Sequence, residues 1–297
     1  MKQIRHRFPH IYLLSGTPAP ENTLNLWTQM YMLDGGVSWG NDYHYFENLV
    51  ASYDVRGKKF VEEKFAELVL KKVSHMIVSG TAKERPLTEV DRPFDVGKEV
   101  LRLYEKLKIE LLIELDSHDY VRATALTIAN KLRQLSSGFL ISSALRSTKE
   151  YETGKLDALV ELSEEYKSES MIIFIQFKHE REQLLRALPG SEAVYSSNAE
   201  EAIDRWNTGE TDRLIIHPRS CAHGLNLQAG GRIAVWYNLP WSCEEYIQGI
   251  GRINRRGQTE KCMNIVMKGV PIDDIIYQKL RSKIEGQEVI LRSIATT

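Results

Sequence analysis

The sequence has 297 residues, of which 42% are hydrophobic and 27% charged, a balance typical of a folded protein of roughly two domains. The formal net charge is −1, so an anionic ligand would have to be held by a local cluster of basic side chains. No apolar run approaches the ~18 residues of a membrane span, and the amino terminus lacks the apolar core of a secretory signal. The cysteines number three, without a CxxC pair, which fits reduced thiols in a cytoplasmic protein.

The first part of the chain is predicted to be mainly helical. An apolar run, IYLL (11–14), ends at SGTPAP, where glycine and prolines stop a regular element. ENTLNLWTQMYML (21–33) has helical apolar spacing, and Asp34-Gly35-Gly36 closes it. The segment 81–97 is interpreted as an extended connector, and two long helices are predicted between residues 98 and 137. Aromatic residues that could stack on bases, but for which burial is the commoner use, are Tyr31, Trp39, Tyr43, Tyr45 and Phe46.

After residue 150, apolar runs alternate with helical patterns. The strand-like runs are MIIFIQF (171–177), EAVYS (192–196), LIIHP (214–218), IAVWY (233–237) and NIVM (264–267). Nearly continuous apolar strands are typical of a parallel sheet with helices on both faces. The alternation therefore predicts an α/β fold with a parallel sheet, whose ligands should lie at the carboxyl ends of the strands.

The segment QGIGRINRRGQ (248–258) holds three arginines and no acid. Ser242, followed three residues later by Glu245, matches a capping box at the start of a helix. Each glycine inside a helix costs about 1 kcal/mol relative to alanine. Gly249 and Gly251 therefore predict that another part of the chain, or a ligand, comes close to this helix.

If this helix continues to a stop at Gly257, it has two distinct faces. The polar stripe consists of Gln248, Arg252 and Arg255. The apolar stripe, expected to face the sheet, consists of Tyr246, Ile250 and Ile253. Guanidinium groups bind phosphate in a bidentate manner, so the polar stripe favours a phosphate site. The alternative is a solvated basic helix end that complements the helix dipole.

Several blocks, in chain order, resemble those of the Swi/Snf-type ATPases of helicase superfamily two: SGTP, LRQLSSGFL, GLNLQ and QGIGRINRRGQ. The form HPRSCAHGLNLQ…WYNLPWS…QGIGRINRRGQ is most similar to the compact version found in bacteriophages and prophages. The resemblance covers about residues 11 to 285. It implies a remnant of helicase lobe one with a helical insertion (1–97), a helical linker between lobes (98–150) and a RecA-like carboxyl-terminal lobe (151–297).

The resemblance also implies roles for individual residues. Two RecA-like lobes of this family close on ATP and Mg²⁺, and lobe two supplies arginine fingers. The finger positions, taken as catalytic, are Arg252 and Arg255, and the ATP-binding positions are Gln248, Gly224 and Asn226. The DNA-binding positions are Gln176, Phe177, Ser220, His223 and Arg256. The positions that couple hydrolysis to movement are Ser15, Gly16 and Thr17.

Two expected parts of a complete ATPase are absent from these residues. There is no GxxxxGK[ST] phosphate loop, since Gly154-Lys155 is followed by leucine and lacks the earlier glycine. There is also no Asp-Glu pair to form a D-E-x-H box. We therefore expect ATP and Mg²⁺ to be bound mainly by an amino-terminal helicase lobe, and this chain alone to be inactive. The expected partners are double-stranded DNA, ATP and that lobe, without a membrane.

The same residues leave two alternatives open. The chain could be a stand-alone, non-catalytic module that binds nucleic acid or a partner, or a fragment of a superfamily 2 RNA helicase. His217, Cys221 and His223 lie close together in the sequence, but a structural zinc site needs four ligands, so no metal site is expected.

Overall fold

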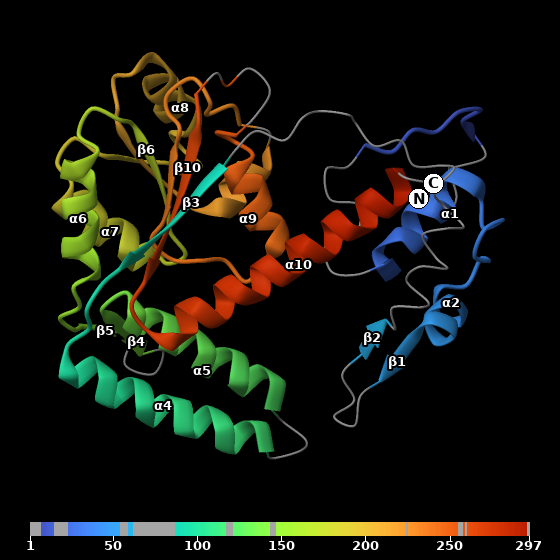
Figure 1. The fold of residues 1–297 in the computed structure, drawn as a ribbon, viewed down its shortest axis with the longest axis horizontal. Coiled ribbons are helices and arrows are strands. Elements are labelled where there is room, and N and C mark those ends of the chain that lie inside the picture. The colour runs from blue at the N-terminus through green and yellow to red at the C-terminus, as the bar shows by residue number, and fades with distance from the viewer. Residues whose placement is uncertain are drawn as a thin grey trace. The chain divides into compact units, whose positions relative to one another are not determined.

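The structure, a computed structural model, describes residues 7–14, 23–53, 59–61, 87–116, 121–142, 147–223, 225–254, 258 and 260–295. The chain divides into two compact units. One unit comprises Met1–Lys83 with Arg281–Thr297, and the other comprises Glu84–Leu280. The second unit contains a six-stranded sheet and its surrounding helices (Figure 1).

The first unit contains the short helices η2 (Thr23–Asn25), α1 (Leu26–Asp34) and α2 (Tyr43–Val50), and the antiparallel strands β1 (Ala51–Tyr53) and β2 (Lys59–Val61). Helix α1 ends as predicted, because Gly35 adopts a left-handed conformation with φ of 74°. Helix α2 begins at Asp42, whose carboxylate accepts the backbone N–H of His44 at 2.8 Å.

Burial explains most of the aromatic residues of this unit. Trp27 stacks on Tyr31 at 5.4 Å between ring centroids and meets Tyr43 edge-on, also at 5.4 Å. Trp39 stacks on Phe46 at 5.0 Å. Of the five aromatic residues considered for base stacking, four therefore pack in this cluster, and Tyr45 is exposed. The IYLL run lies in neither helix nor strand, and its Tyr12 and Leu14 side chains are exposed.

The second unit confirms the predicted parallel α/β fold. Its six-stranded sheet has the order β3-β10-β9-β6-β8-β7, and every neighbouring pair is parallel. The strands are β3 (Leu87–Pro93), β6 (Met171–Phe174), β7 (Glu192–Ala193), β8 (Arg213–Ile216), β9 (Ile233–Trp236) and β10 (Cys262–Lys268). The helices are α4 (Lys98–Asp116), α5 (Val121–Ser136), α6 (Lys155–Glu165), α7 (Lys178–Ala187), α8 (Ala199–Thr208), α9 (Cys243–Ile250) and the part of α10 (Pro271–Ala295) up to Leu280.

The sheet is covered on both faces, as the continuous apolar strands predict. Alternate strand residues such as Ile173 and Val235 pack with Leu159 of α6 and Leu184 of α7. On the opposite face, Trp236 packs against Tyr246 of α9 with ring centroids 4.8 Å apart. Helices α6 and α7 accordingly lie on one side of the sheet and α9 on the other (Figure 1).

The segment expected to be a connector contains an edge strand. Leu87–Pro93 forms β3, which pairs in parallel with Cys262–Lys268 along its whole length. The expected domain boundary at residue 97 thus lies inside the compact unit that begins at Glu84. Residues along β3 are exposed or half-buried, so this edge strand lacks the apolar run that identified the other strands. For this reason the sequence did not predict β3 as a strand.

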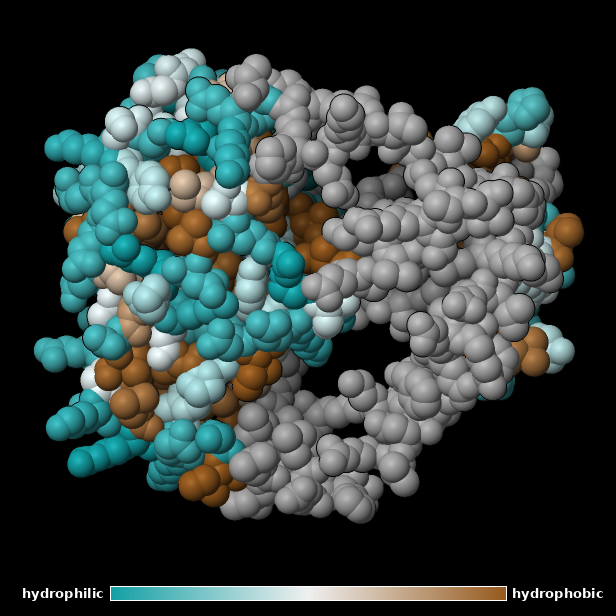
Figure 2. Space-filling view, viewed as in Figure 1, coloured by the Kyte–Doolittle hydropathy of each residue, from teal (hydrophilic) through white to brown (hydrophobic). Residues whose placement is uncertain are grey.

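Between α5 and α6 the chain forms a small antiparallel hairpin of β4 (Phe139–Ser142) and β5 (Ser147–Glu150). Hydrophilic residues predominate on the visible surface around the sheet, with apolar residues in patches between them (Figure 2). Within the described part of the chain, no helix is both long and apolar enough to span a membrane.

Candidate nucleotide and nucleic-acid site

The carboxyl ends of the central strands carry several of the predicted site residues. Gln176 and Phe177 follow β6, and the short helix η4 (Pro218–His223) follows β8. Asn238 follows β9, the strand between β6 and β10. Because all these strands are parallel, the three loops meet at one edge of the sheet, where the sequence predicted the chemistry.

Glu180 fixes the loop after β6. One of its carboxylate oxygens, Oε2, accepts the backbone N–H groups of Gln176 at 2.7 Å and Phe177 at 3.0 Å. The other, Oε1, accepts the Ser137 hydroxyl at 2.6 Å and the Asn238 side-chain amide at 2.8 Å. The Glu180 side chain is fully buried, so these bonds are shielded from water. Glu180 thereby ties the Gln176–Phe177 loop to α5 and to the end of β9.

Lys155 lies beside this network and is also fully buried. Its Nζ donates to the Ser136 hydroxyl at 3.1 Å and to the Ser137 hydroxyl at 3.3 Å, and it lies 4.9 Å from the ring centroid of Tyr237. Ser136 in turn donates to the Asp273 carboxylate at 2.9 Å. Burial lowers the pKa of Lys155, while the charge of Asp273 opposes that shift. Lys155 therefore belongs to the folded core of this edge and forms no part of a phosphate loop.

Arg133 completes the network as a second buried cation. Its Nε donates to the Asn238 Oδ1 at 3.2 Å, and its Nη2 donates to the Leu239 carbonyl. Burial lowers the pKa of Arg133 to about 10, and the nearby Glu180 and Asp273 charges oppose this shift. The positive charges of Lys155 and Arg133 are thus balanced by the negative charges of Glu180 and Asp273. The sequence singled out the LRQLSSGFL block that contains Arg133, but it did not identify the carboxylates as its partners.

Gln176 and Phe177 have different environments, although both are predicted DNA-binding residues. The Gln176 Nε2 is buried and has no hydrogen-bond partner among the described residues. The Phe177 ring packs edge-on against Phe139 at 5.5 Å, with the Arg133 guanidinium 5.5 Å from its centroid. Gln176 thus retains a free donor at the sheet edge, whereas the Phe177 ring takes part in packing.

Sequence analysis missed Arg181, which lies in the first turns of α7. Its guanidinium lies over the Tyr195 ring, 4.1 Å from the centroid, at the end of β7. The Arg181 Nε is buried without a hydrogen-bond partner in the described part of the chain. Arg181 therefore adds an oriented positive charge to the same edge as Gln176. No motif marks this residue, so only its position reveals it.

Helix η4 begins with a histidine cap. The Nδ1 atom of His217 accepts the backbone N–H of Arg219 at 3.2 Å, and the His217 carbonyl accepts the N–H of Ser220 at 2.9 Å. The Arg219 Nε donates to Glu245 of α9 at 2.8 Å, although the Arg219 side chain is 80% exposed. Predicted site residue Ser220 is partly buried. Among the described residues, no group of three or more His, Cys, Asp or Glu side chains could hold a metal ion.

The His217 cap predicts a pH effect on stability. Burial lowers the pKa of His217 below its ordinary value of 6.5, and an accepting Nδ1 must be unprotonated. Since the folded-state pKa is depressed, this stabilisation is complete above pH 6.5 and is lost as the pH falls below it. We expect His217→Asn, whose Oδ1 can cap without titrating, to lose less stability between about pH 7.5 and about pH 5.5 than the wild type does. Urea unfolding at both pH values measures this, and an equal loss in both proteins would contradict it.

The capping residue of α9 is as predicted. The Ser242 hydroxyl accepts the N–H of Glu245 at 3.3 Å, but the Glu245 carboxylate binds Arg219 instead of completing the capping box. The expectation that the helix continues to Gly257 is wrong in extent, because α9 ends at Ile250 and a turn follows. Consequently, the predicted polar and apolar stripes are not carried by one continuous helix.

The glycine at position 249 permits close packing on the sheet. A Cβ added to Gly249 would lie 2.8 Å from the Trp236 ring and 3.1 Å from the Phe174 ring. These two rings stack on each other at 4.2 Å, and Tyr246 and Ile253 are fully buried nearby. The predicted close approach at Gly249 is thus confirmed, and the approaching groups are sheet side chains.

Gln248 lies within α9, whereas Arg252 lies in the turn that follows the helix. The Gln248 side chain donates to Glu244 at 2.9 Å within α9. Arg252 is partly buried, and its Nη1 donates to the Leu225 carbonyl at 3.2 Å. The Arg252 Nε is buried and has no hydrogen-bond partner among the described residues. The structure thereby brings Arg252 to the GLNLQ segment.

The GLNLQ segment itself is anchored from its other side. Leu227 is fully buried, and its carbonyl accepts the Trp206 indole N–H at 2.8 Å. A side chain at Gly230 would collide with Trp206, which explains a glycine at this position. Asn226 is exposed, and its carbonyl accepts the Asn207 side-chain amide at 3.0 Å. The remaining predicted site residues lie outside the described residues: Ser15, Gly16, Thr17, Gly224, Arg255, Arg256 and the side chain of His223.

Part of this region is similar to known proteins. Residues 154–257 match the family model described as "Helicase conserved C-terminal domain". Protein p41 of Acyrthosiphon pisum secondary endosymbiont phage 1 is 28% identical over 315 aligned residues, covering 99% of this chain and 67% of that protein.

Two solved structures are also similar to parts of this chain. The C-terminal part of the Fun30 ATPase domain has a TM-score of 0.48 and 13% identity, covering 69% of this chain and 97% of that one. S. cerevisiae Dbp5 bound to RNA and ADP BeF3 has a TM-score of 0.38 and 19% identity, covering 47% of this chain and 42% of that one. Residues 154–257, which include strands β6 to β9 of the parallel sheet, are thus similar to the helicase conserved C-terminal domain.

Proposed function

We propose that the chain is the carboxyl-terminal part of an ATP-dependent translocase or helicase of Swi/Snf type that moves on double-stranded DNA. The observation that carries this proposal is the state of Arg252. Its guanidinium is oriented by the Leu225 carbonyl, and its buried Nε has no partner in the described part of the chain. A fixed arginine with unused donors suits a phosphate supplied from outside this lobe. We assign Arg252, with Arg255, the role of arginine finger toward ATP.

The proposed DNA surface lies at the carboxyl edge of the sheet. Gln176 and Arg181 each have a buried donor nitrogen without a partner among the described residues, and Arg219, which pairs with Glu245, is exposed on η4 after the neighbouring strand β8. Donors and guanidinium groups of this kind bind backbone phosphates without reading base sequence. Such contacts support binding that weakens with added salt, as expected of a translocase that moves along any sequence.

The proposed reaction needs a second lobe. The phosphate loop and the D-E-x-H box do not occur in these residues, so we infer that another lobe, in the same protein or in a partner, binds most of ATP and its Mg²⁺. Closure of the two lobes would place Arg252 at the γ-phosphate, where a positive charge stabilises the transition state. Hydrolysis would then release the closed state and move the lobe along the DNA.

ATPase assays test this proposal. We expect no ATP turnover from the 297 residues alone, and DNA-stimulated turnover when they are joined to an amino-terminal lobe with a phosphate loop. Duplex DNA and RNA should be compared in parallel, because stronger stimulation by RNA would favour an RNA helicase. Turnover by the chain alone would contradict the proposed division of the site. A stand-alone binding module would show nucleic-acid binding without turnover in either form.

A further inference from the structure

A cavity of about 590 Å³ lies at the carboxyl end of the sheet, within the second unit and apart from Arg252. Its walls come from the loop after β3, the end of α5, the chain after β5, the first turn of α6 and the end of β9. The volume is within the range of small-molecule sites in proteins. Ser137 and Gly138 of the LRQLSSGFL block line this cavity, but no residue assigned to ATP or DNA does.

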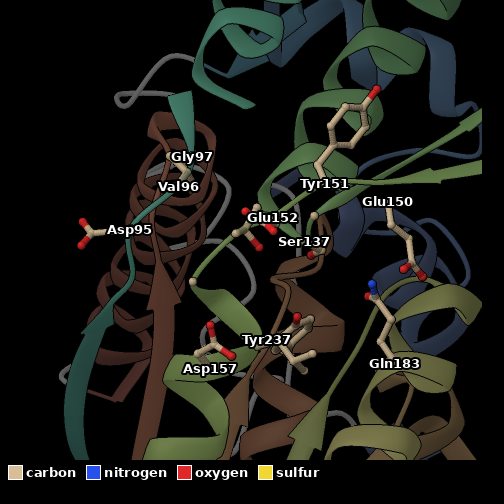
Figure 3. A pocket seen from close by; sticks show the side chains of 14 residues that line it. Asp95, Val96, Gly97, Ser137, Glu150, Tyr151, Glu152, Asp157, Gln183 and Tyr237 are labelled. Atoms are coloured by element: carbon tan, nitrogen blue, oxygen red, sulfur yellow. The ribbon is translucent and has the colours of Figure 1, made fainter. Parts of the chain in front are cut away.

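The lining of this cavity is acidic and contains no Lys, Arg or His side chain. Glu152 and Asp157 are exposed, and neither carboxylate has an ion-pair or hydrogen-bond partner among the residues that the structure describes. Glu150 also lines the cavity, but His179 already pairs with it at 2.8 Å. In Figure 3, Glu152 and Asp157 lie on opposite sides of the same space, whereas Asp95 points away from it. Two carboxylates are therefore available at the cavity for a positive ligand.

Two uncharged polar side chains in the cavity wall are also without hydrogen-bond partners among the described residues. Tyr237 is only 1% exposed, yet its hydroxyl has no hydrogen-bond partner within the described part of the chain. The Gln183 Oε1 is likewise buried and unpaired. A buried polar atom without a partner costs about 1–3 kcal/mol, so the Gln183 Oε1, beside the unpaired Tyr237 hydroxyl, points to a ligand that satisfies both groups. Tyr237 lies next to Asp157 in Figure 3, and Gln183 lies next to Glu150.

The polar groups that line the cavity indicate which class of ligand it can bind. An amide oxygen and carboxylates accept hydrogen bonds, so the ligand must donate them and carry positive charge. Lys155 Nζ lies 4.9 Å from the Tyr237 ring centroid, but it donates to Ser136 and Ser137 and is balanced by buried carboxylates. The described residues hold no group of three or more metal-ligating side chains. An organic cation therefore fits this wall better than a metal ion does.

We propose that this cavity binds an organic cation, with an ammonium or guanidinium group donating to Tyr237 and Gln183 and its charge facing Glu152 and Asp157. The cation is either a free polyamine or a lysine or arginine side chain of another polypeptide. This inference is independent of the proposed ATPase function, because the cavity contains no residue assigned to ATP or DNA.

Calorimetric titration of the 297-residue chain at physiological ionic strength tests the proposal. One arm uses spermidine, and the other uses a peptide with a single lysine flanked by neutral residues. We expect saturable binding with one site in at least one arm, and the arm that binds identifies the source of the cation. The double variant Glu152→Gln/Asp157→Asn should weaken binding about tenfold, as expected for two partly screened charge contacts.

Two further variants test whether binding depends on the cavity itself. Glu164→Gln/Asp204→Asn removes the same charge from exposed residues outside the cavity and should leave binding unchanged. Tyr237→Phe removes only the unpaired hydroxyl, so the protein should fold normally while binding weakens. Failure of both probes to bind, or an equal loss in the cavity and control double variants, would overturn the proposal.

Discussion

Replacement of Arg252 by alanine should reduce ATP hydrolysis by a factor of about 10³ or more in a protein that carries this domain together with its ATP-binding lobe. The reason is that Arg252 has an oriented, partly buried guanidinium whose Nε has no partner within the described residues. Loss of a charge that acts in the transition state lowers the turnover rate far more than it lowers affinity for ATP. Binding to duplex DNA should be kept, since the proposed DNA contacts lie on other loops.

Steady-state ATPase rates and DNA binding by fluorescence anisotropy measure these two effects separately. Arg252→Lys should recover only part of the rate, because lysine keeps the charge but loses the planar donor pair. Arg186→Ala is the matched control, since this arginine of α7 is 67% exposed and belongs to neither proposed site. Hydrolysis that survives Arg252→Ala would remove this residue from the finger role.

Replacement of Lys155 by alanine should lower the free energy of unfolding by about 3–5 kcal/mol. Lys155 is fully buried, and it shares the network of Ser136 and Ser137 with the Asp273 and Glu180 carboxylates. Removal of one cation leaves buried carboxylates with too little positive charge, which is more costly than the loss of one surface ion pair.

Urea denaturation of the isolated chain measures this effect. Lys149→Ala is the control, because Lys149 pairs with Glu99 at 3.5 Å and both side chains are about 70% exposed. It should cost about 0–1 kcal/mol. The double variant Lys155→Met/Asp273→Asn should be more stable than Lys155→Ala, since it removes one uncompensated carboxylate along with the cation. Equal costs for Lys155→Ala and Lys149→Ala would show that the buried network does not stabilise the fold.

The candidate site was only partly predictable from the sequence. The order of the blocks placed Gln176, η4 and Arg252 in one lobe, and the Ser242 cap located the start of α9 correctly. The end of α9 was not predictable, because helical spacing continues beyond Ile250 while the backbone turns there. Arg181 was missed for a different reason. Its guanidinium is placed by contact with the Tyr195 ring at the sheet edge, and no local pattern in the sequence shows this contact.

The sequence by itself determined the parallel sheet, because buried strands need apolar residues on both faces and the helices between them need amphipathic spacing. Only the tertiary structure decided the role of β3, whose mixed pattern becomes a strand by pairing with β10, about 175 positions later in the chain. The tertiary structure also decided the burial of Lys155, although a lysine at the start of a helix is expected at the surface. Ser136 and Asp273, which lie 137 positions apart, meet beside it. Long-range pairing and charge balance of this kind depend on which segments the fold brings together, so no local pattern of residues records them.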